Sequence, residues 1–235
     1  MNATMSRRGL VLGGLAMFVA SCADSEGQGR AAFIAFLRER LLQPRGLRVP
    51  QLTEAETRRF GIYARHYDPI REFHDTLTRD VAPLMSSAAR ILPALRRPQD
   101  WVAKRSDVAE SRKLIGHART RASDLFAATN TAVSHLAQPD DLRAVYQDAY
   151  RKTVSEVAPL FIATLDGLDD LFDNVDQAAA YIDANRGRMR LVGGMFETAD
   201  TSVLTGLQER SAAIAGAQAR LFQVRGRLDS LMARG

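Results

Sequence analysis

Apolar residues recur every three or four positions along most of this 235-residue chain. Such spacing places them on one face of an α-helix, so each stretch predicts a helix that buries one side. The stretches span 60–95, 115–136, 142–171 and 207–231, with a shorter one at 31–43. At 1.5 Å per residue, the long helices would be rods of about 45 to 65 Å. We therefore predict an all-α fold, an elongated antiparallel bundle of about four long helices plus a short N-terminal helix.

Local signals predict where these helices begin and bend. Thr53 opens the pattern Thr-Glu-Ala-Glu, a capping box in which two side chains bind backbone N–H groups at a helix start. Asp68 precedes Pro69 and is expected to cap a restarted helix. Pro83 and Pro159 lie inside apolar repeats and each removes one backbone N–H group. We expect a helix kink at both prolines.

The segment near 188–198 breaks the helical pattern. Polar and apolar residues alternate before Gly193 and Gly194, and this glycine pair permits positive φ angles. A small β-hairpin and an irregular loop are both consistent with these residues. A lone hairpin is marginal in water, so a hairpin here would have to pack on the end of the bundle.

The N-terminal sequence resembles an export signal. Arg7 and Arg8 precede an apolar stretch at 9–20, and Cys22, the only cysteine, follows small residues. This order resembles the lipobox of bacterial lipoproteins, in which the chain is cut between Ser21 and Cys22 and the thiol is acylated. An ordinary signal peptide, or a helix with a chance cysteine, is the alternative. The paired arginines also resemble a twin-arginine signal, so the export route stays open.

The lipobox interpretation divides the chain into three parts. We expect a cleaved signal peptide at 1–21, a lipidated cysteine and polar tether at 22–29, and a helical-bundle domain at 30–235. The covalent lipid would hold the protein to a membrane on the periplasmic side, and Ala23 after the cysteine favours the outer membrane. Cleavage would lower the net charge from +5 to +3, because only two arginines and no acid are removed. So mild an excess does not indicate nucleic-acid binding.

One cluster of polar residues invites a metal interpretation: His66, Asp68, Glu72, His74 and Asp75. Ligands on one helix need a separation of three or four residues, whereas Glu72 and His74 are two apart. We therefore expect no metal and no cofactor. His74 lies on the apolar face, where a partly buried structural histidine is the preferred interpretation. Its replacement by leucine is expected to leave stability similar or to raise it.

Two charged stripes have matching helical spacing. The acidic stripe is Asp166, Asp169, Asp170, Asp173 and Asp176, and the basic stripe is Arg105, Arg112 and Arg119. The stripes are expected to face each other as a solvated salt-bridge network. Binding of the basic stripe to anionic lipid headgroups is the functional alternative.

The chain lacks a nucleophile elbow, a zinc motif, a P-loop and a dinucleotide fingerprint. We therefore expect a non-catalytic binding or structural module of the cell envelope, whose partner is another envelope protein or an anionic lipid. A lipid-binding protein is one alternative and predicts an open apolar groove between helices. A periplasmic enzyme is the other, and needs a pocket with convergent polar groups.

Several short motifs resemble the YiaF-like lipoproteins, a family of unknown function. They are Glu26, the segment 30–37, Pro50-Gln51-Leu52-Thr53, Arg97-Pro98-Gln99-Asp100-Trp101, Asp140-Asp141-Leu142 and Tyr181-Ile182. The resemblance implies a lipoprotein and supplies no catalytic residues. The paired arginines of the leader depart from the family pattern.

Overall fold

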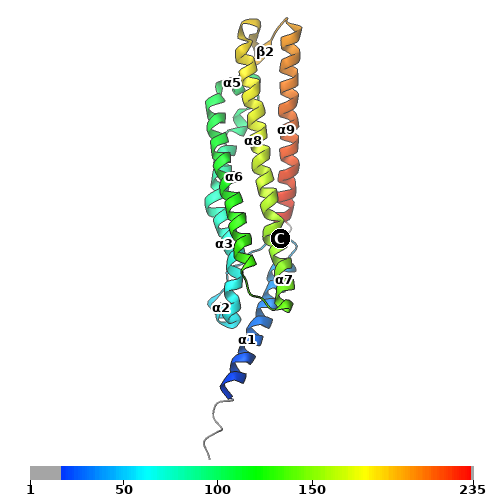
Figure 1. Ribbon diagram of the computed structural model, residues 1–235. Helices are drawn as coiled ribbons and strands as arrows, with labels where there is room; N and C mark the ends of the chain where they lie inside the picture. The colour runs from blue at the N-terminus through cyan, green and yellow to red at the C-terminus, as the bar shows by residue number, and fades with distance from the viewer. Residues whose placement is uncertain (1–16, 234–235) are drawn as a thin grey trace, which may run out of the picture.

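The computed structural model describes the backbone of residues 17–233 and the side chains of 25–232. It is a tall antiparallel helical bundle with a small two-stranded sheet at one end (Figure 1). The predicted all-α class, the elongated bundle and the hairpin are confirmed. No helix in the described part of the chain is long and apolar enough to cross a membrane.

The first column of the bundle is built from short helical pieces. It runs through α2 (Glu54–Phe60), the 3-10 turn η2 (Gly61–Tyr67), α3 (Asp68–Thr76), the π turn η3 (Leu77–Val81), α4 (Ala82–Ala89) and the 3-10 turn η4 (Leu92–Ala94). The predicted capping box is present: the Glu56 N–H donates to the Thr53 hydroxyl at 3.1 Å. Asp68 does not cap α3 as expected. Its carboxylate accepts a hydrogen bond from Arg71 at 3.2 Å instead.

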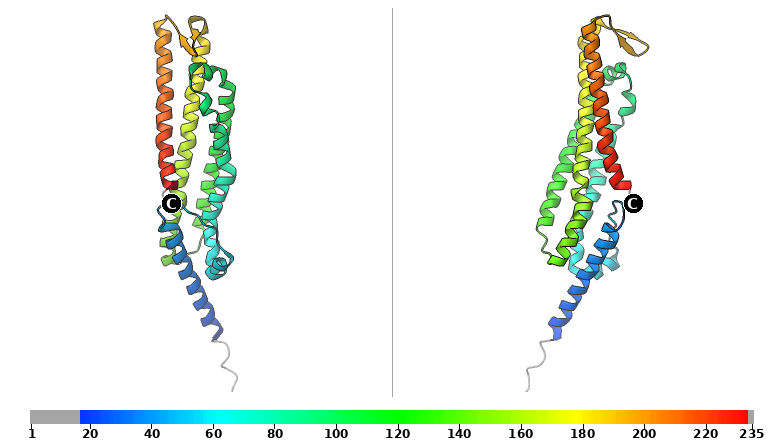
Figure 2. Two further views of the ribbon diagram at one scale, coloured as in Figure 1. Left: turned by 180° about the vertical axis from the view of Figure 1, so that it is seen from behind. Right: turned by 90° about the vertical axis from the view of Figure 1, so that its right-hand side faces the viewer.

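The longer helices complete the bundle. The chain descends through α5 (Pro98–Ala103) and α6 (Arg105–Ser134), then rises through α7 (Asp140–Tyr150), the π turn η5 (Arg151–Ser155) and α8 (Val157–Ala184). After the 3-10 turn η6 (Arg186–Arg188) and the strands β1 (Arg190–Val192) and β2 (Met195–Glu197), α9 (Thr201–Ala233) descends again (Figure 2).

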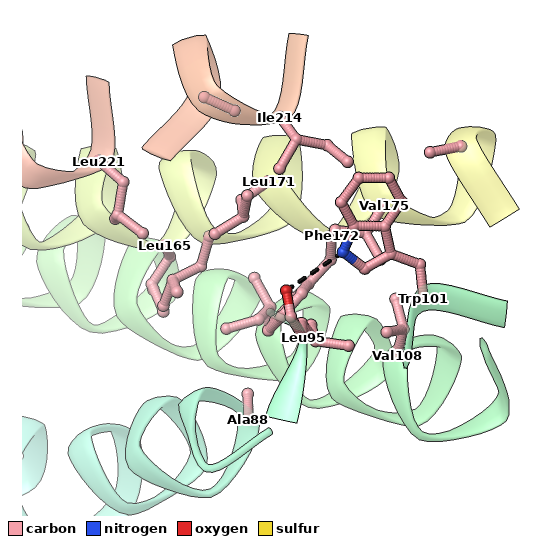
Figure 3. Close-up of a cluster of buried hydrophobic side chains, with 14 of the residues drawn as sticks. Ala88, Leu95, Trp101, Val108, Leu165, Leu171, Phe172, Val175, Ile214 and Leu221 are labelled. Carbon is pink, nitrogen blue, oxygen red and sulfur yellow. Dashed lines mark hydrogen bonds between the residues drawn. The ribbon is translucent and has the colours of Figure 1, made fainter. Parts of the chain in front are cut away.

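The fourth position of the bundle is shared by two segments. Beside the upper part of the bundle it holds α9, which ends before the bundle does. Beside the lower part it holds α1 (Met17–Phe36) with the π turn η1 (Leu37–Leu42) (Figure 2). The buried side chains accordingly form two clusters, an upper one around α8 and a lower one around α1, α3 and α7. Figure 3 shows the upper cluster, in which the Trp101 indole N–H donates to the Leu95 carbonyl at 3.1 Å.

The segment at 22–29 differs from the expected tether, because it is helical and belongs to α1. Gly29 is buried, and a Cβ atom added there would lie 3.0 Å from the Phe60 carbonyl oxygen. The Tyr63 hydroxyl donates to the Glu26 carboxylate at 3.0 Å. Gly29 therefore serves the close approach of two helices, and contacts with the bundle begin before residue 30.

The sheet is a hairpin with a two-residue turn. Its turn residues Gly193 and Gly194 have φ angles of 57° and 87°, which glycine adopts without strain. Phe196 packs against the upper cluster, as a hairpin of this size requires. Leu191, which pairs with Phe196 in the middle of the hairpin, stays 55% exposed.

The contact of α8 with α9 gives a stability prediction. A Cβ atom added at Gly206 would overlap the ring and hydroxyl of Tyr181, whereas one added at Gly226 meets nothing within 4 Å. We expect Gly206→Ala to lower the free energy of unfolding by about 1 to 3 kcal/mol through this overlap. Gly226→Ala should raise it by up to about 1 kcal/mol, because alanine favours the helix. Urea denaturation of both variants measures the difference, and equal effects would contradict the packing of α9 on α8.

Candidate functional site

An apolar groove of about 490 Å³ runs along the upper half of the bundle between the α4–η4 segment and α9. Its floor is a set of buried side chains of α8 and α9: Leu168, Leu171, Val175 and Leu221. Met85, Ala89 and Leu92 line one wall, and Phe222 and Leu228 line the other. The volume lies in the range of about 300 to 1,000 Å³ that is typical of small-molecule sites.

The groove exists because the bundle is open on one side. Helix α4 packs on α6, and α9 packs on α8, so a gap remains between α4 and α9. Gly167 permits the close approach of α9, since a Cβ atom there would lie 3.3 Å from Leu221. The Phe222 ring on the wall of the groove is 72% exposed. Because this ring lines the same groove as Leu221 and Leu228, it extends a contiguous apolar surface, the kind of surface that is common at binding sites.

Polar groups lie at the rim and not on the floor. The Thr164 hydroxyl at the lower end is already used, because it donates to the Leu160 carbonyl at 2.8 Å. Arg225 forms an ion pair with Asp229 at 3.6 Å. Arg96 is exposed and has no hydrogen-bond or ion-pair partner among the residues described here. The groove can therefore bind an apolar ligand and contact it with one unpaired cationic side chain, that of Arg96.

The groove was expected for a lipid-binding protein, but the sequence did not supply its residues. The apolar face predicted for α9 includes Leu221 and Leu228 and omits Phe222. Phe222 was the available signal, because a large apolar residue outside the repeat has no core to enter. No feature of the sequence predicted that η4 would line the groove, because the position of η4 depends on how the first column bends.

The predicted lipidation site lies far from this groove. The cleavage point between Ser21 and Cys22 falls within α1, in the part that projects beyond the lower end of the bundle (Figure 1). The leader up to residue 16 and the Cys22 side chain lie outside the described residues.

The histidine and acidic cluster is dispersed over separate contacts. His66 contacts Gln138 at 3.3 Å, and His74 Nε2 lies 2.6 Å from the Thr153 carbonyl oxygen of η5. Arg71 forms ion pairs with Asp68 and with Asp75. Within 25–232, no group of three or more candidate ligands surrounds a common point.

His74 lies in the buried seam, as expected, and also joins α3 to η5. Burial lowers the pKa of this imidazole, and the carbonyl of Thr153 only partly offsets that effect. The ring is therefore neutral at pH 7, with Nε2 donating to the carbonyl. The expectation that leucine would keep or raise stability did not include this hydrogen bond, which the substitution would remove.

The two charged stripes pair across α6 and α8. Arg105 lies 2.6 Å from Asp176, Arg112 lies 2.7 Å from Asp173, and Arg119 lies 3.2 Å from Asp166. Exposed pairs of this kind contribute roughly 0 to 1 kcal/mol each. Because each arginine of the stripe already has an aspartate partner, the stripe offers less to an outside anion than Arg96 does.

Comparison with known proteins places the chain in a family. The model for the family described as "Protein of unknown function (DUF3053)" matches residues 10–228. The chain belongs to the DUF3053 family. It is 28% identical over 140 residues to the uncharacterised protein YiaF of Escherichia coli K12, and equally similar to YiaF of Shigella flexneri. The alignment covers 60% of this chain and 59% of each relative, less than two thirds of their length.

No solved structure matches this DUF3053 chain. The match to the family model includes the segment around Cys22, all of the bundle columns and most of α9. The resemblance to YiaF-like proteins found from short motifs is thereby confirmed.

The bond between His74 and Thr153 gives a pH prediction. At pH 7, His74→Leu should lower the free energy of unfolding by about 1 kcal/mol, the usual value of one hydrogen bond. The lowered pKa of His74 means that the unfolded chain binds more protons between that pKa and about 6.5. The wild-type protein therefore loses stability as the pH falls through this window, and the variant loses less.

Chemical denaturation at pH 7 and pH 5 measures the gap between wild type and variant, which should narrow at pH 5. His117→Leu is the control, because His117 lies on the exposed face of α6 and should change stability by no more than about 0.5 kcal/mol. A gap that widens on acidification would mean that His74 is held as a cation.

Proposed function

We propose that this protein is a lipid-anchored lipoprotein of the cell envelope, and that its helical bundle is a non-catalytic binding module. The observation that carries the proposal is the leader: two arginines, an apolar stretch of signal-peptide length, and small residues before the only cysteine, Cys22. Acylation of that thiol would attach the chain to the membrane on the periplasmic side. Ala23 favours the outer membrane.

The shape of the bundle supports an anchored role. Helix α1 carries the position of Cys22 away from the body, so a lipid there would hold the lower end toward the membrane (Figure 1). The column from Asp140 to Ala184 is about 65 Å long at 1.5 Å per residue. The groove would thus face the aqueous compartment, well above the lipid surface.

The groove supports lipid binding as a second candidate function. A floor of aliphatic side chains beneath an exposed phenylalanine suits a hydrocarbon ligand. The lining holds no histidine, cysteine or lysine, and its one carboxylate is paired with Arg225. This composition favours binding over acid–base or nucleophilic catalysis. A partner protein of the envelope remains the alternative occupant of the bundle surface.

The anchoring proposal predicts the behaviour of Cys22→Ala. In cells fed an alkyne-tagged fatty acid, the wild-type protein should incorporate the label and the variant should not, because the thiol is the acceptor. The variant should also keep the leader, since lipoprotein cleavage follows acylation. Ser6→Ala is a matched leader variant and should be labelled as the wild type is. Equal labelling of Cys22→Ala and wild type would refute the anchor.

A further inference from the structure

The two ends of the groove differ in charge. At the upper end, Arg96 follows Leu95 just beyond η4, lines the groove and is free of partners among the described residues. At the lower end the charge of Arg225 is neutralised by Asp229. An anionic group would therefore be attracted to the upper end and not to the lower end.

The path between these ends is apolar and narrow. Thr164 and Val175, which line the two ends of the floor, are eleven residues apart on α8, or about 16 Å at 1.5 Å per residue. The groove has about 490 Å³, a volume typical of small-molecule sites, and its apolar lining suits a hydrocarbon chain.

We propose that the groove binds a long-chain fatty acid with its carboxylate on Arg96 and its chain directed along α8 toward Leu228. This inference rests on the proposed binding role and names its ligand. The planar guanidinium of Arg96 can bind both oxygens of a carboxylate. The chain would cover the floor and the 72% exposed ring of Phe222, which accounts for that exposure. Each methylene buried should raise the affinity about fourfold until the chain fills the groove.

The protein carries its own reporter for this binding. Trp101 is the only tryptophan, and its indole N–H is hydrogen-bonded to the carbonyl of Leu95, which lines the upper end of the groove. Bromine quenches indole fluorescence only at short range. A bromine near the carboxylate of the ligand should therefore quench Trp101 strongly, and a bromine at the far end of the chain should quench it weakly.

The experiment titrates the full-length protein, reconstituted in phosphatidylcholine vesicles, with fatty acids brominated near the carboxylate or at the chain end. The alcohol of the same chain length is a third ligand. We expect the near-carboxylate bromine to quench more strongly. The acid should bind more tightly than the alcohol by up to about fivefold, because Arg96 is exposed and an exposed ion pair contributes modestly.

Arg96→Gln should reduce the affinity for the acid to that for the alcohol. Arg90→Gln is the matched control, because Arg90 is an exposed arginine between α4 and η4 that does not line the groove. Its side chain has no partner among the described residues. Ala89→Phe should fill the groove and abolish quenching while circular dichroism stays helical. If that variant fails to fold, the comparison of the two bromine positions in the wild type still tests whether the carboxylate end of the ligand lies near Trp101.

Equal quenching by both bromine positions, or equal affinity for acid and alcohol in the wild type, would overturn the proposal. Quenching that persists in folded Ala89→Phe would place the ligand elsewhere and would also overturn it. Acyl labelling of Cys22 is measured independently. A failure of the anchor is therefore distinguishable from a failure of the groove to bind fatty acid.

Discussion

The burial of α8 is the constraint on which the rest of the structure depends. Twelve of its side chains are buried, from Val157 at its base to Ile182 near its top, so one neighbouring helix could not cover them. Helices α5, α6 and α9 pack around it and form the upper cluster. The apolar side chains of α8 that face the gap between α4 and α9 form the floor of the groove. The candidate site is thus the side of the upper cluster on which no helix packs.

Three π turns in the described part of the chain, η1, η3 and η5, let the helical columns stay continuous close to a proline. Each one contains the residue four positions before a proline: Arg40 before Pro44, Arg79 before Pro83, and Ser155 before Pro159. The proline ring would collide with that carbonyl in a regular α-helix, and the wider turn relieves the collision. Side chains then bind the displaced backbone. Lys152 donates to the carbonyls of Leu41 and Leu42, and His74 binds that of Thr153.

These polar links fasten the N-terminal segment to the lower cluster. The ammonium group of Lys152 lies at the C-terminal end of η1, where helix carbonyls carry partial negative charge, and burial lowers its pKa. These contacts hold η1, and α1 continues from η1 in one direction away from the lower end of the bundle (Figure 1). If Cys22 is acylated, that direction sets the distance of the groove from the membrane.

The sequence by itself determined the helical repeats, the capping box at Thr53 and the pairing of the charged stripes, and it left a hairpin and a loop open at Gly193 and Gly194. These features depend on neighbours a few residues apart or on one repeat facing another. Only the tertiary structure decided that α1 and α9 share one bundle position, that Gly29 lies at a close approach of two helices, and that Arg96 lines an open groove. Each of these depends on where separate helices end relative to one another, and no local spacing encodes that.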